Sequence, residues 1–433
     1  MKKRIKRVLT LITAMALVLA GLNFTAPVNV KAADASGKKI VVSLGDSYSS
    51  GEGIEPFFGQ DKDSADKVED EDWLAHRSKK AWSSLLKIDG QKMTKDDNWF
   101  FVAASGAEVG NLTGTFTKSY NYDGLSGSKA LAPQFDVFEE VNKKYGEGSI
   151  DFVTISIGGN DVGFTDIMIT AIQKPTELDD LLETTWKRFM DGTDDTPAIR
   201  DNIKEAYKAI AKKAGKQASI IVAGYPKLLN PDGFNVIIYK VTSETATKVD
   251  EWASKLNDEI AKIVEECKEE GLNIYFVSVE DAFTGHEAYS DDPYINNVIV
   301  GTQSQDLNSE NVVSSYSLHP NATGAKAYAK EVQKVIDSIS KSSTSGKTTK
   351  PVVTATSKKG KITLKWDKVE GATKYRVVEY VNGKAKTVKT TKKTSLSIKN
   401  RTKGEEYTFA VKAYVNKKWT KITSSDKKTV TVK

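Results

Sequence analysis

Short apolar runs alternate with amphipathic stretches along residues 33–340. Runs rich in β-branched and aromatic residues predict strands, and apolar residues at helical spacing predict helices between them. This alternation favours an α/β domain, a three-layer α/β/α sandwich in which helices cover both faces of a five-stranded parallel sheet. Functional residues are then expected at the carboxyl ends of the strands. The strand runs lie at 39–44, 99–104, 151–157, 219–224 and 273–279, and the main helical stretches at 133–145, 197–215 and 244–271.

The pattern changes near residue 350. Three later segments alternate apolar and polar side chains, with no helical stretch between them, as strands with one buried face do. They are residues 360–367, 374–381 and 407–415. The polar segment 341–350 has no apolar residue and separates the two patterns, so it is predicted to be a linker between two domains, 33–340 and 351–433.

The second domain carries a recognisable set of residues. Trp366 lies on one predicted strand, and Gly404 stands three residues before Tyr407 at the start of another. This arrangement resembles a fibronectin type III domain, and the resemblance covers residues 351–433. It implies a C-terminal all-β sandwich.

The N-terminus has the features of a secretory signal peptide. Basic residues at positions 2–7 precede an apolar run from Val8 to about Ala20, and small residues lead up to Ala32. We predict that residues 1–32 are removed after Ala32. No later stretch approaches the roughly 20 apolar residues that a membrane-spanning helix needs. The mature protein is therefore expected to be secreted, as an extracellular or surface-associated protein with no membrane span.

Charge is distributed unevenly along the chain, although the whole sequence carries only +6. Residues 341–433 contain 25 Lys and Arg against six Asp and Glu, a net charge of +19, whereas residues 33–340 carry −19. An acidic body joined to a basic C-terminal domain suggests two units with different partners. An anionic cell-wall polymer or an acidic polysaccharide is a candidate partner of the basic domain.

A candidate nucleophile follows the first predicted strand. The strand leads directly into Gly45-Asp46-Ser47, and Gly51 and Gly53 follow shortly after. Glycines permit a tight turn, which would expose Ser47 at the carboxyl end of a buried strand. The triplet alone is equally consistent with an ordinary turn.

Three further segments change this interpretation. Residues 104–107 (ASGA) follow the second strand, residues 158–161 (GGND) follow the third, and residues 318–321 (LHPN) precede the last helix of the domain. Together with Ser47 they resemble, in order, the four signature blocks of the SGNH hydrolases, also called GDSL esterases and lipases. The resemblance spans about residues 38–340 and implies a flavodoxin-like sheet and a secreted serine ester hydrolase.

The resemblance also implies roles for particular residues. Ser47 matches the family nucleophile and His319 its general base. The donors of the oxyanion hole would be the backbone N–H of Ser47, the backbone N–H of Gly106 and the side-chain amide of Asn160. Glycine leaves a main-chain donor accessible, and an amide donates without bringing a charge.

The sequence departs from the family at the third catalytic position. Many members carry Asp three residues before the histidine, and here that residue is Tyr316. One interpretation is a Ser47–His319 dyad whose histidine is oriented by a main-chain carbonyl near Tyr316 or Ser317. The alternative is a triad completed by an aspartate from elsewhere, such as Asp161 or Asp306.

The remaining histidines and the cysteine suggest no second chemistry. His76 and His286 are expected to have structural roles near the rim of the site. No two histidines stand at metal-ligand spacing and Cys267 is the only cysteine, so neither a metal site nor an intramolecular disulfide is expected. The phosphate-binding pattern GxxxxGK[ST] does not occur. We therefore expect no cofactor and no nucleic-acid partner.

Three functions remain open at this point. Hydrolysis of lipid or other carboxylic esters is the one we favour, because the resemblance is closest to the secreted esterase and lipase branch. A polysaccharide O-deacetylase is the first alternative, since aromatic residues in the segment 54–98 could stack on sugars. An inactive cell-surface adhesion or binding protein is the second, although the presence of Ser47, Gly106, Asn160 and His319 speaks against it.

Overall fold

The structure is a computed structural model that describes residues 37–433, except residues 347–349, 370, 382, 416–417 and 423–425. The predicted signal peptide, 1–32, lies outside the described residues. The chain divides into two compact units, Met1–Gln333 and Lys334–Lys433.

The first unit is built on a five-stranded parallel sheet in the order β11-β8-β7-β1-β4. All six residues of β1 and all five of β8 are buried, because helices cover both faces of the sheet. The predicted α/β sandwich is confirmed, and each of the five predicted runs forms one of its strands. These are β1 (Ile40–Gly45), β4 (Trp99–Phe101), β7 (Ile150–Ser156), β8 (Ser219–Ala223) and β11 (Ile274–Val277).

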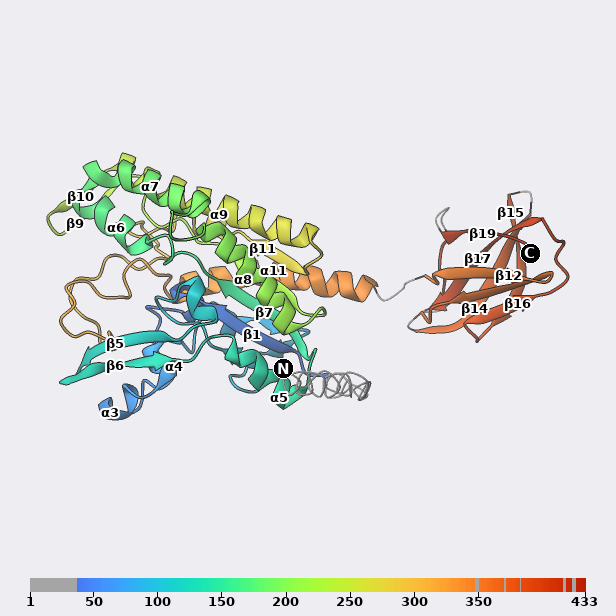
Figure 1. Ribbon diagram of the computed structural model, residues 1–433, viewed down its shortest axis with the longest axis horizontal. Helices are drawn as coiled ribbons and strands as arrows, with labels where there is room; N and C mark the ends of the chain where they lie inside the picture. The colour runs from blue at the N-terminus through green and yellow to red at the C-terminus, as the bar shows by residue number, and fades with distance from the viewer. Residues whose placement is uncertain (1–36, 347–349, 370, 382, 416–417, 423–425) are drawn as a thin grey trace, which may run out of the picture. The chain divides into compact units, whose positions relative to one another are not determined.

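Helices lie on the two faces of this sheet. The three predicted helical stretches are confirmed as α5 (Asp136–Tyr145), α8 (Ile199–Ala214) and α9 (Ser243–Glu269), and the last helix is α11 (Ala322–Gly346). In Figure 1, α8 crosses in front of the sheet and α11 lies behind it. Trp82, in the connection between β1 and β4, stacks on Tyr328 of α11 at a centroid distance of 5.9 Å. That connection therefore packs on the α11 face.

Shorter elements fill the connections between the strands. Further helices follow β1, β7 and β11, and three small antiparallel hairpins project from the loops. The helices are α2 (Ser47–Ser50), α3 (Ser64–Lys67), α4 (Glu71–Leu74), α6 (Phe164–Gln173), α7 (Leu178–Asp191) and α10 (Glu280–Phe283), with 3-10 turns at Trp82–Leu85, Val109–Leu112 and Pro175–Glu177. The hairpins are β2 (Lys87–Ile88) with β3 (Gln91–Lys92), β5 (Phe116–Tyr122) with β6 (Leu125–Leu131), and β9 (Phe234–Val236) with β10 (Tyr239–Val241).

The second unit contains two antiparallel sheets, β12-β13-β16 and β15-β14-β17-β18, with β19 paired to β17. Inward-facing residues of both sheets form one apolar core around Trp366, Tyr375 and Phe409. The predicted all-β C-terminal sandwich is confirmed. Its strands are β12 (Val353–Lys358), β13 (Lys361–Trp366), β14 (Ala372–Val381), β15 (Lys384–Thr391), β16 (Ser395–Ile398), β17 (Glu406–Val415), β18 (Lys418–Trp419) and β19 (Lys428–Thr431).

The predicted linker 341–350 begins inside a helix. The helix α11 continues to Gly346, so it includes the first six residues of that segment. Residues 347–349 lie outside the described residues.

Candidate active site

The turn that carries Ser47 is set by the end of β1. Gly45 has φ +124°, and a Cβ atom there would lie 2.2 Å from the carbonyl oxygen of Ser156 on the neighbouring strand β7. Only glycine fits this position. Asp46 then caps α2 by accepting a hydrogen bond from the backbone N–H of Tyr48 at 3.0 Å. Ser47 is thus the first residue of a capped helical turn at the carboxyl edge of the sheet.

The side chain of Asp46 links the ends of three strands. It accepts hydrogen bonds from Ser156 Oγ at 2.7 Å and from Tyr225 Oη at 2.5 Å, and Tyr225 Oη in turn accepts from the backbone N–H of Gly159 at 2.9 Å. Burial raises the pKa of Asp46 to about 6, against the opposing effect of these hydrogen bonds. The carboxyl group therefore holds the Ser47 turn next to the loop that carries Asn160.

His319 contacts the candidate nucleophile directly. Its Nε2 lies 2.8 Å from Ser47 Oγ, and its Nδ1 lies 3.0 Å from the carbonyl oxygen of Ser317. Burial lowers the pKa of His319 below the usual 6.5, although the charge of Glu52 and the Ser317 carbonyl act in the opposite direction. The ring is therefore placed to accept a proton from Ser47 in its neutral form.

The loop that carries His319 is fastened to the Ser47 turn. Leu318 adopts a left-handed conformation with φ +59°, and its carbonyl accepts a hydrogen bond from Tyr48 Oη at 2.9 Å. On the other side, the backbone N–H of Asn296 donates to the carbonyl of His319 at 2.8 Å. Tyr48, the residue next to Ser47, thus fixes the loop of His319.

Two further elements carry the predicted oxyanion donors. Gly106 has φ +83°, and Asn160 Nδ2 donates to the carbonyl of Ala107 at 2.9 Å, which orients the amide. In the part of the chain that the structure describes, the backbone N–H groups of Ser47 and Gly106 have no hydrogen-bond acceptor. Both groups can therefore donate to a bound oxygen.

All four predicted residues line one cavity of about 690 Å³. Its polar end contains Ser47, Gly106, Asn160 and His319. Aliphatic and aromatic side chains from α6, α9, the β9–β10 hairpin, the segment between β8 and β9 and the loop before His319 form most of the remaining wall. They are Phe164, Met168, Ile169, Ile172, Leu228, Val236, Ile237, Tyr239, Trp252, Ala253, Leu256, Val298, Val312 and Val313.

The two alternative aspartates have other partners. Both carboxylate oxygens of Asp161 accept from the backbone N–H of Val109 at 3.1 Å. Asp306 accepts from the backbone N–H groups of Gln303 and Ser315 at 2.6 and 3.0 Å. It is the carbonyl of Ser317 that faces His319 Nδ1.

The other two histidines lie apart from the Ser47–His319 contact. His76 is buried, and its Nδ1 lies 2.8 Å from a carboxylate oxygen of Glu52. His286 stacks on Tyr294 with ring centroids 3.8 Å apart, and its Nδ1 lies 2.7 Å from the carbonyl oxygen of Asp292.

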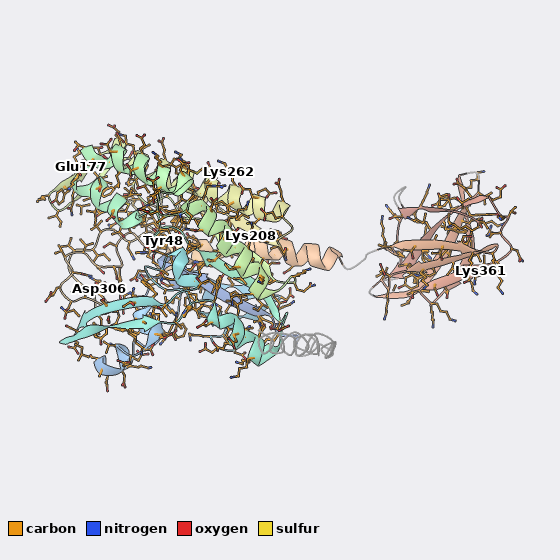
Figure 2. All side chains as sticks on the ribbon, in the orientation of Figure 1. Tyr48, Glu177, Lys208, Lys262, Asp306 and Lys361 are labelled. Atoms are coloured by element: carbon orange, nitrogen blue, oxygen red, sulfur yellow. The ribbon has the colours of Figure 1, made fainter. Side chains whose placement is uncertain are left out.

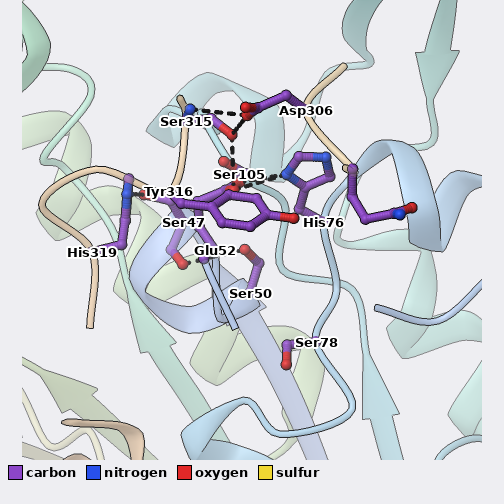
Figure 3. A network of polar contacts seen from close by, with 12 residues as sticks. Ser47, Ser50, Glu52, His76, Ser78, Ser105, Asp306, Ser315, Tyr316 and His319 are labelled. Atoms are coloured by element: carbon purple, nitrogen blue, oxygen red, sulfur yellow. Dashed lines mark hydrogen bonds and ion pairs between the residues drawn. The ribbon is translucent and has the colours of Figure 1, made fainter. Parts of the chain in front are cut away.

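Glu52 is a component of the site that the motif comparison did not identify. Figure 3 shows it between His76 and Ser315, and Ser315 Oγ lies 3.0 Å from its carboxylate and 2.7 Å from that of Asp306. Burial alone would raise the pKa of Glu52, but the charge and hydrogen bond of His76 hold that pKa well below its usual range. The acidic residue between Gly51 and Gly53, directly after the Ser47 turn, was the available signal in the sequence.

Known proteins match both units of this chain. The sequence profile of the GDSL-like Lipase/Acylhydrolase family matches residues 43–327. The chain belongs to this family. It is therefore a carboxylic ester hydrolase, as the resemblance implied. A second profile, the PBP1-like, fibronectin3-like domain, matches residues 355–424, which confirms the fibronectin-like assignment.

Similar proteins of this family come from Streptomyces. Lipase 1 of Streptomyces coelicolor is 29% identical over 308 residues, which cover 71% of this chain and 90% of the relative. A lipase of Streptomyces rimosus is 27% identical, with coverage of 74% and 92%. Among solved structures, the extracellular lipase of S. rimosus has 24% identity and a TM-score of 0.47, covering 69% of this chain and 99% of that one. Phospholipase A1 of Streptomyces albidoflavus has 25% identity and a TM-score of 0.46, with coverage of 70% and 99%.

The electrostatics of His319 predict the acid limb of the pH profile. A histidine acts as a base only when it is neutral, so with His319 in its predicted role kcat/KM should fall below the pKa of His319, with a midpoint under 6.5. Glu52 favours the protonated ring, and Glu52→Gln should therefore move this midpoint to still lower pH. The measurement is kcat/KM for a water-soluble p-nitrophenyl ester between about pH 4 and 9.

Glu55→Gln is the matched control, because Glu55 accepts a hydrogen bond from Tyr316 Oη and is not among the main groups that shift the pKa of His319. It should leave the midpoint unchanged. A midpoint that stays in place or rises in Glu52→Gln would contradict the electrostatic coupling.

Proposed function

We propose that this protein is a secreted serine hydrolase of lipid esters that works through a Ser47–His319 dyad and an oxyanion hole. The observation that carries the proposal is the 2.8 Å contact between Ser47 Oγ and His319 Nε2 at the polar end of a largely apolar cavity. A nucleophile next to its base, with free N–H donors beside them, is the arrangement that acyl transfer requires.

The geometry supports the following sequence of steps. As Ser47 Oγ attacks the ester carbonyl, His319 Nε2 takes its proton, while Nδ1–H donates to the carbonyl of Ser317. The backbone N–H groups of Ser47 and Gly106 and the amide of Asn160 donate to the developing oxyanion. His319 then protonates the leaving alcohol, and a water molecule, activated by the same ring, attacks the acyl-enzyme and releases the acid.

A dyad fits the contacts of His319 better than a triad. The Ser317 carbonyl can fix the tautomer of the ring by accepting the Nδ1 proton, and the carboxylates of Asp161 and Asp306 are engaged by backbone N–H groups elsewhere. A carbonyl brings no full negative charge to stabilise the imidazolium. Glu52 supplies negative charge at longer range, since its carboxylate favours protonation of His319.

The wall of the cavity favours an acyl chain over a sugar as the main recognition element. Removal of an acetyl group from a polysaccharide needs polar groups for the sugar, whereas most of this wall is apolar. The relatives named lipase and phospholipase A1 agree with this choice. An inactive adhesion protein would have no need for a hydrogen-bonded Ser47–His319 pair.

Secretion is part of the proposal. It rests on the basic and apolar segments of residues 1–32 and on the extracellular relative. Within the described residues, every helix is too short or too polar to cross a membrane.

The first test removes the nucleophile and the base. Ser47→Ala and His319→Ala should each lower kcat for a p-nitrophenyl ester by at least about 10,000-fold, as loss of such groups does in serine hydrolases. His286→Ala is the control, because that ring lies outside the cavity and should leave kcat within about twofold. Thermal unfolding verifies that each variant is folded, and a folded Ser47→Ala protein with wild-type turnover would refute the assignment.

Asn160 provides a separate test of the oxyanion hole. Asn160→Ala should lower kcat roughly 100-fold to 1,000-fold with little change in KM, because its hydrogen bond strengthens only as charge develops on the substrate oxygen. Steady-state kinetics with the same ester measures both constants. A variant whose KM rises while kcat is preserved would show that Asn160 binds the substrate instead.

We further propose that the basic C-terminal unit binds an anionic polymer. Lys358, Lys359, Lys361, Lys399 and Arg401 surround one depression of about 450 Å³ on this unit, and Lys361 is labelled in Figure 2. The net charge of +19 for residues 341–433 points to the same partner class. Such attraction is long-range and weakened by salt.

Retention of the full chain on immobilised heparin tests this proposal. Replacing the four lysines of the depression by Gln should lower the salt concentration needed for elution, because the local positive charge is reduced. The control replaces four lysines of the first unit by Gln and should elute like the parent protein. The control positions are Lys62, Lys174, Lys262 and Lys268. If the depression variant and the control variant eluted at the same salt concentration, this depression would be ruled out as the binding site.

A further inference from the structure

Exposed aliphatic side chains are concentrated around the mouth of the active-site cavity. Among the described residues, nine large hydrophobic side chains are exposed. Three of them, Leu85, Val352 and Val381, lie elsewhere. The other six, which we call the aliphatic rim, are Ile169, Ile237, Ile238, Val300, Val312 and Val313.

The aliphatic rim is continuous with the cavity. Ile169, Ile237, Val312 and Val313 belong to its wall, together with Ser47 and His319. Ile238 is the chain neighbour of Ile237, and the strand-like bridge between residues 300 and 313 places Val300 next to Val313. An apolar path therefore runs from the outer surface of the protein to the reacting groups.

The tip of the β9–β10 hairpin presents its side chains at a conformational cost. Ile237 and Ile238 form the two-residue loop between β9 and β10, with exposed fractions of 69% and 84%. Ile237 has φ +54°, a left-handed conformation that suits Gly or Asn and disfavours a β-branched residue. Solvent exposure and backbone conformation both disfavour isoleucine here. This indicates that the two side chains contact an apolar partner when the protein functions.

The base of the hairpin is held rigidly. Phe234 stacks on Tyr289 with ring centroids 4.1 Å apart, and Figure 1 shows β9 and β10 beside α6, which carries Ile169. Val312 reaches 75% exposure on the loop that lies before His319. The rim is therefore assembled from three separate segments that surround one opening.

We propose that the aliphatic rim docks the protein on the surface of aggregated neutral or zwitterionic lipid, so that an ester in that surface reaches Ser47. The inference rests on the proposed lipid ester hydrolysis and specifies how its substrate is presented. Branched aliphatic side chains without a charged member suit the hydrocarbon region beneath lipid headgroups. The net charge of −19 on residues 33–340 disfavours an anionic surface.

Flotation of vesicles of dioleoylphosphatidylcholine tests this proposal. The full chain with Ser47→Ala is used, because this variant should bind the lipid without hydrolysing it. Ile238→Asn with Val300→Thr changes two rim residues outside the cavity wall, and Asn suits a hairpin loop. The partition coefficient should fall on the order of tenfold, because two aliphatic side chains no longer enter the lipid. Binding should vary little between about 0.1 and 1 M salt, unlike binding through the basic C-terminal unit.

Val352→Thr with Val381→Thr is the matched control, since it removes two exposed aliphatic side chains far from the rim in sequence. This variant should partition like the parent protein. In the Ser47-containing protein, the rim variant should lose dispersed phosphatidylcholine turnover by the same factor and keep p-nitrophenyl acetate turnover within about twofold. The soluble substrate also verifies that the variant is folded.

Several results would overturn the proposal. One is that the parent protein fails to bind vesicles, and another is that the rim variant binds them as strongly as the parent does. A fall in the partition coefficient of the control variant as large as that of the rim variant would also overturn it. Self-association in lipid-free buffer that the rim variant abolishes would identify a second copy of the chain as the occupant instead. Rim-dependent vesicle binding together with undiminished ester turnover by Ser47→Ala would leave the docking intact and refute the proposed nucleophile.

Discussion

The buried carboxyl group of Asp46 is the interaction on which the geometry of the site depends. A carboxylate away from water is stable only when its oxygens are hydrogen-bonded, and here the donors come from Tyr48, Ser156 and Tyr225. These residues belong to the Ser47 turn, the end of β7 and the segment after β8. Because Tyr225 Oη also accepts a hydrogen bond from the backbone N–H of Gly159, the hydrogen bonds of this one buried carboxylate position the Ser47 turn next to the loop of Asn160.

The loop of His319 is held by a second set of contacts that converges on the same turn. Tyr48 Oη donates a hydrogen bond to the carbonyl of Leu318. Glu52, four residues later, accepts a hydrogen bond from the hydroxyl of Ser315. The segment from residue 46 to residue 52 therefore supplies Ser47, the cap of its helical turn and two anchors for the loop of His319. These anchors fix the loop of His319, so that its Nδ1 stays next to the carbonyl of Ser317.

The sequence could predict the sheet, and could point to four candidate residues that line one cavity, because both inferences depend on local patterns. Apolar runs identified all five strands, and each site residue stands directly beside a predicted element. The partners of Asp46 and Glu52 could not be found in this way. Tyr225 is 179 residues from Asp46, and Ser315 is 263 residues from Glu52, so only the fold brings them together. The extension of α11 into the polar segment after residue 340 was missed because that segment lacks apolar periodicity.

The two units of the chain combine attractions of different range. Charge on the C-terminal unit acts over roughly 8 Å at physiological ionic strength, whereas burial of Ile238 or Val312 contributes only on contact. A polymer bound by the basic unit would hold the enzyme near its source of substrate without occupying the cavity. Contact between the aliphatic rim and lipid would then bring an ester in the lipid surface to Ser47. Each attraction can be weak, because tethering raises the effective concentration at which the second contact forms.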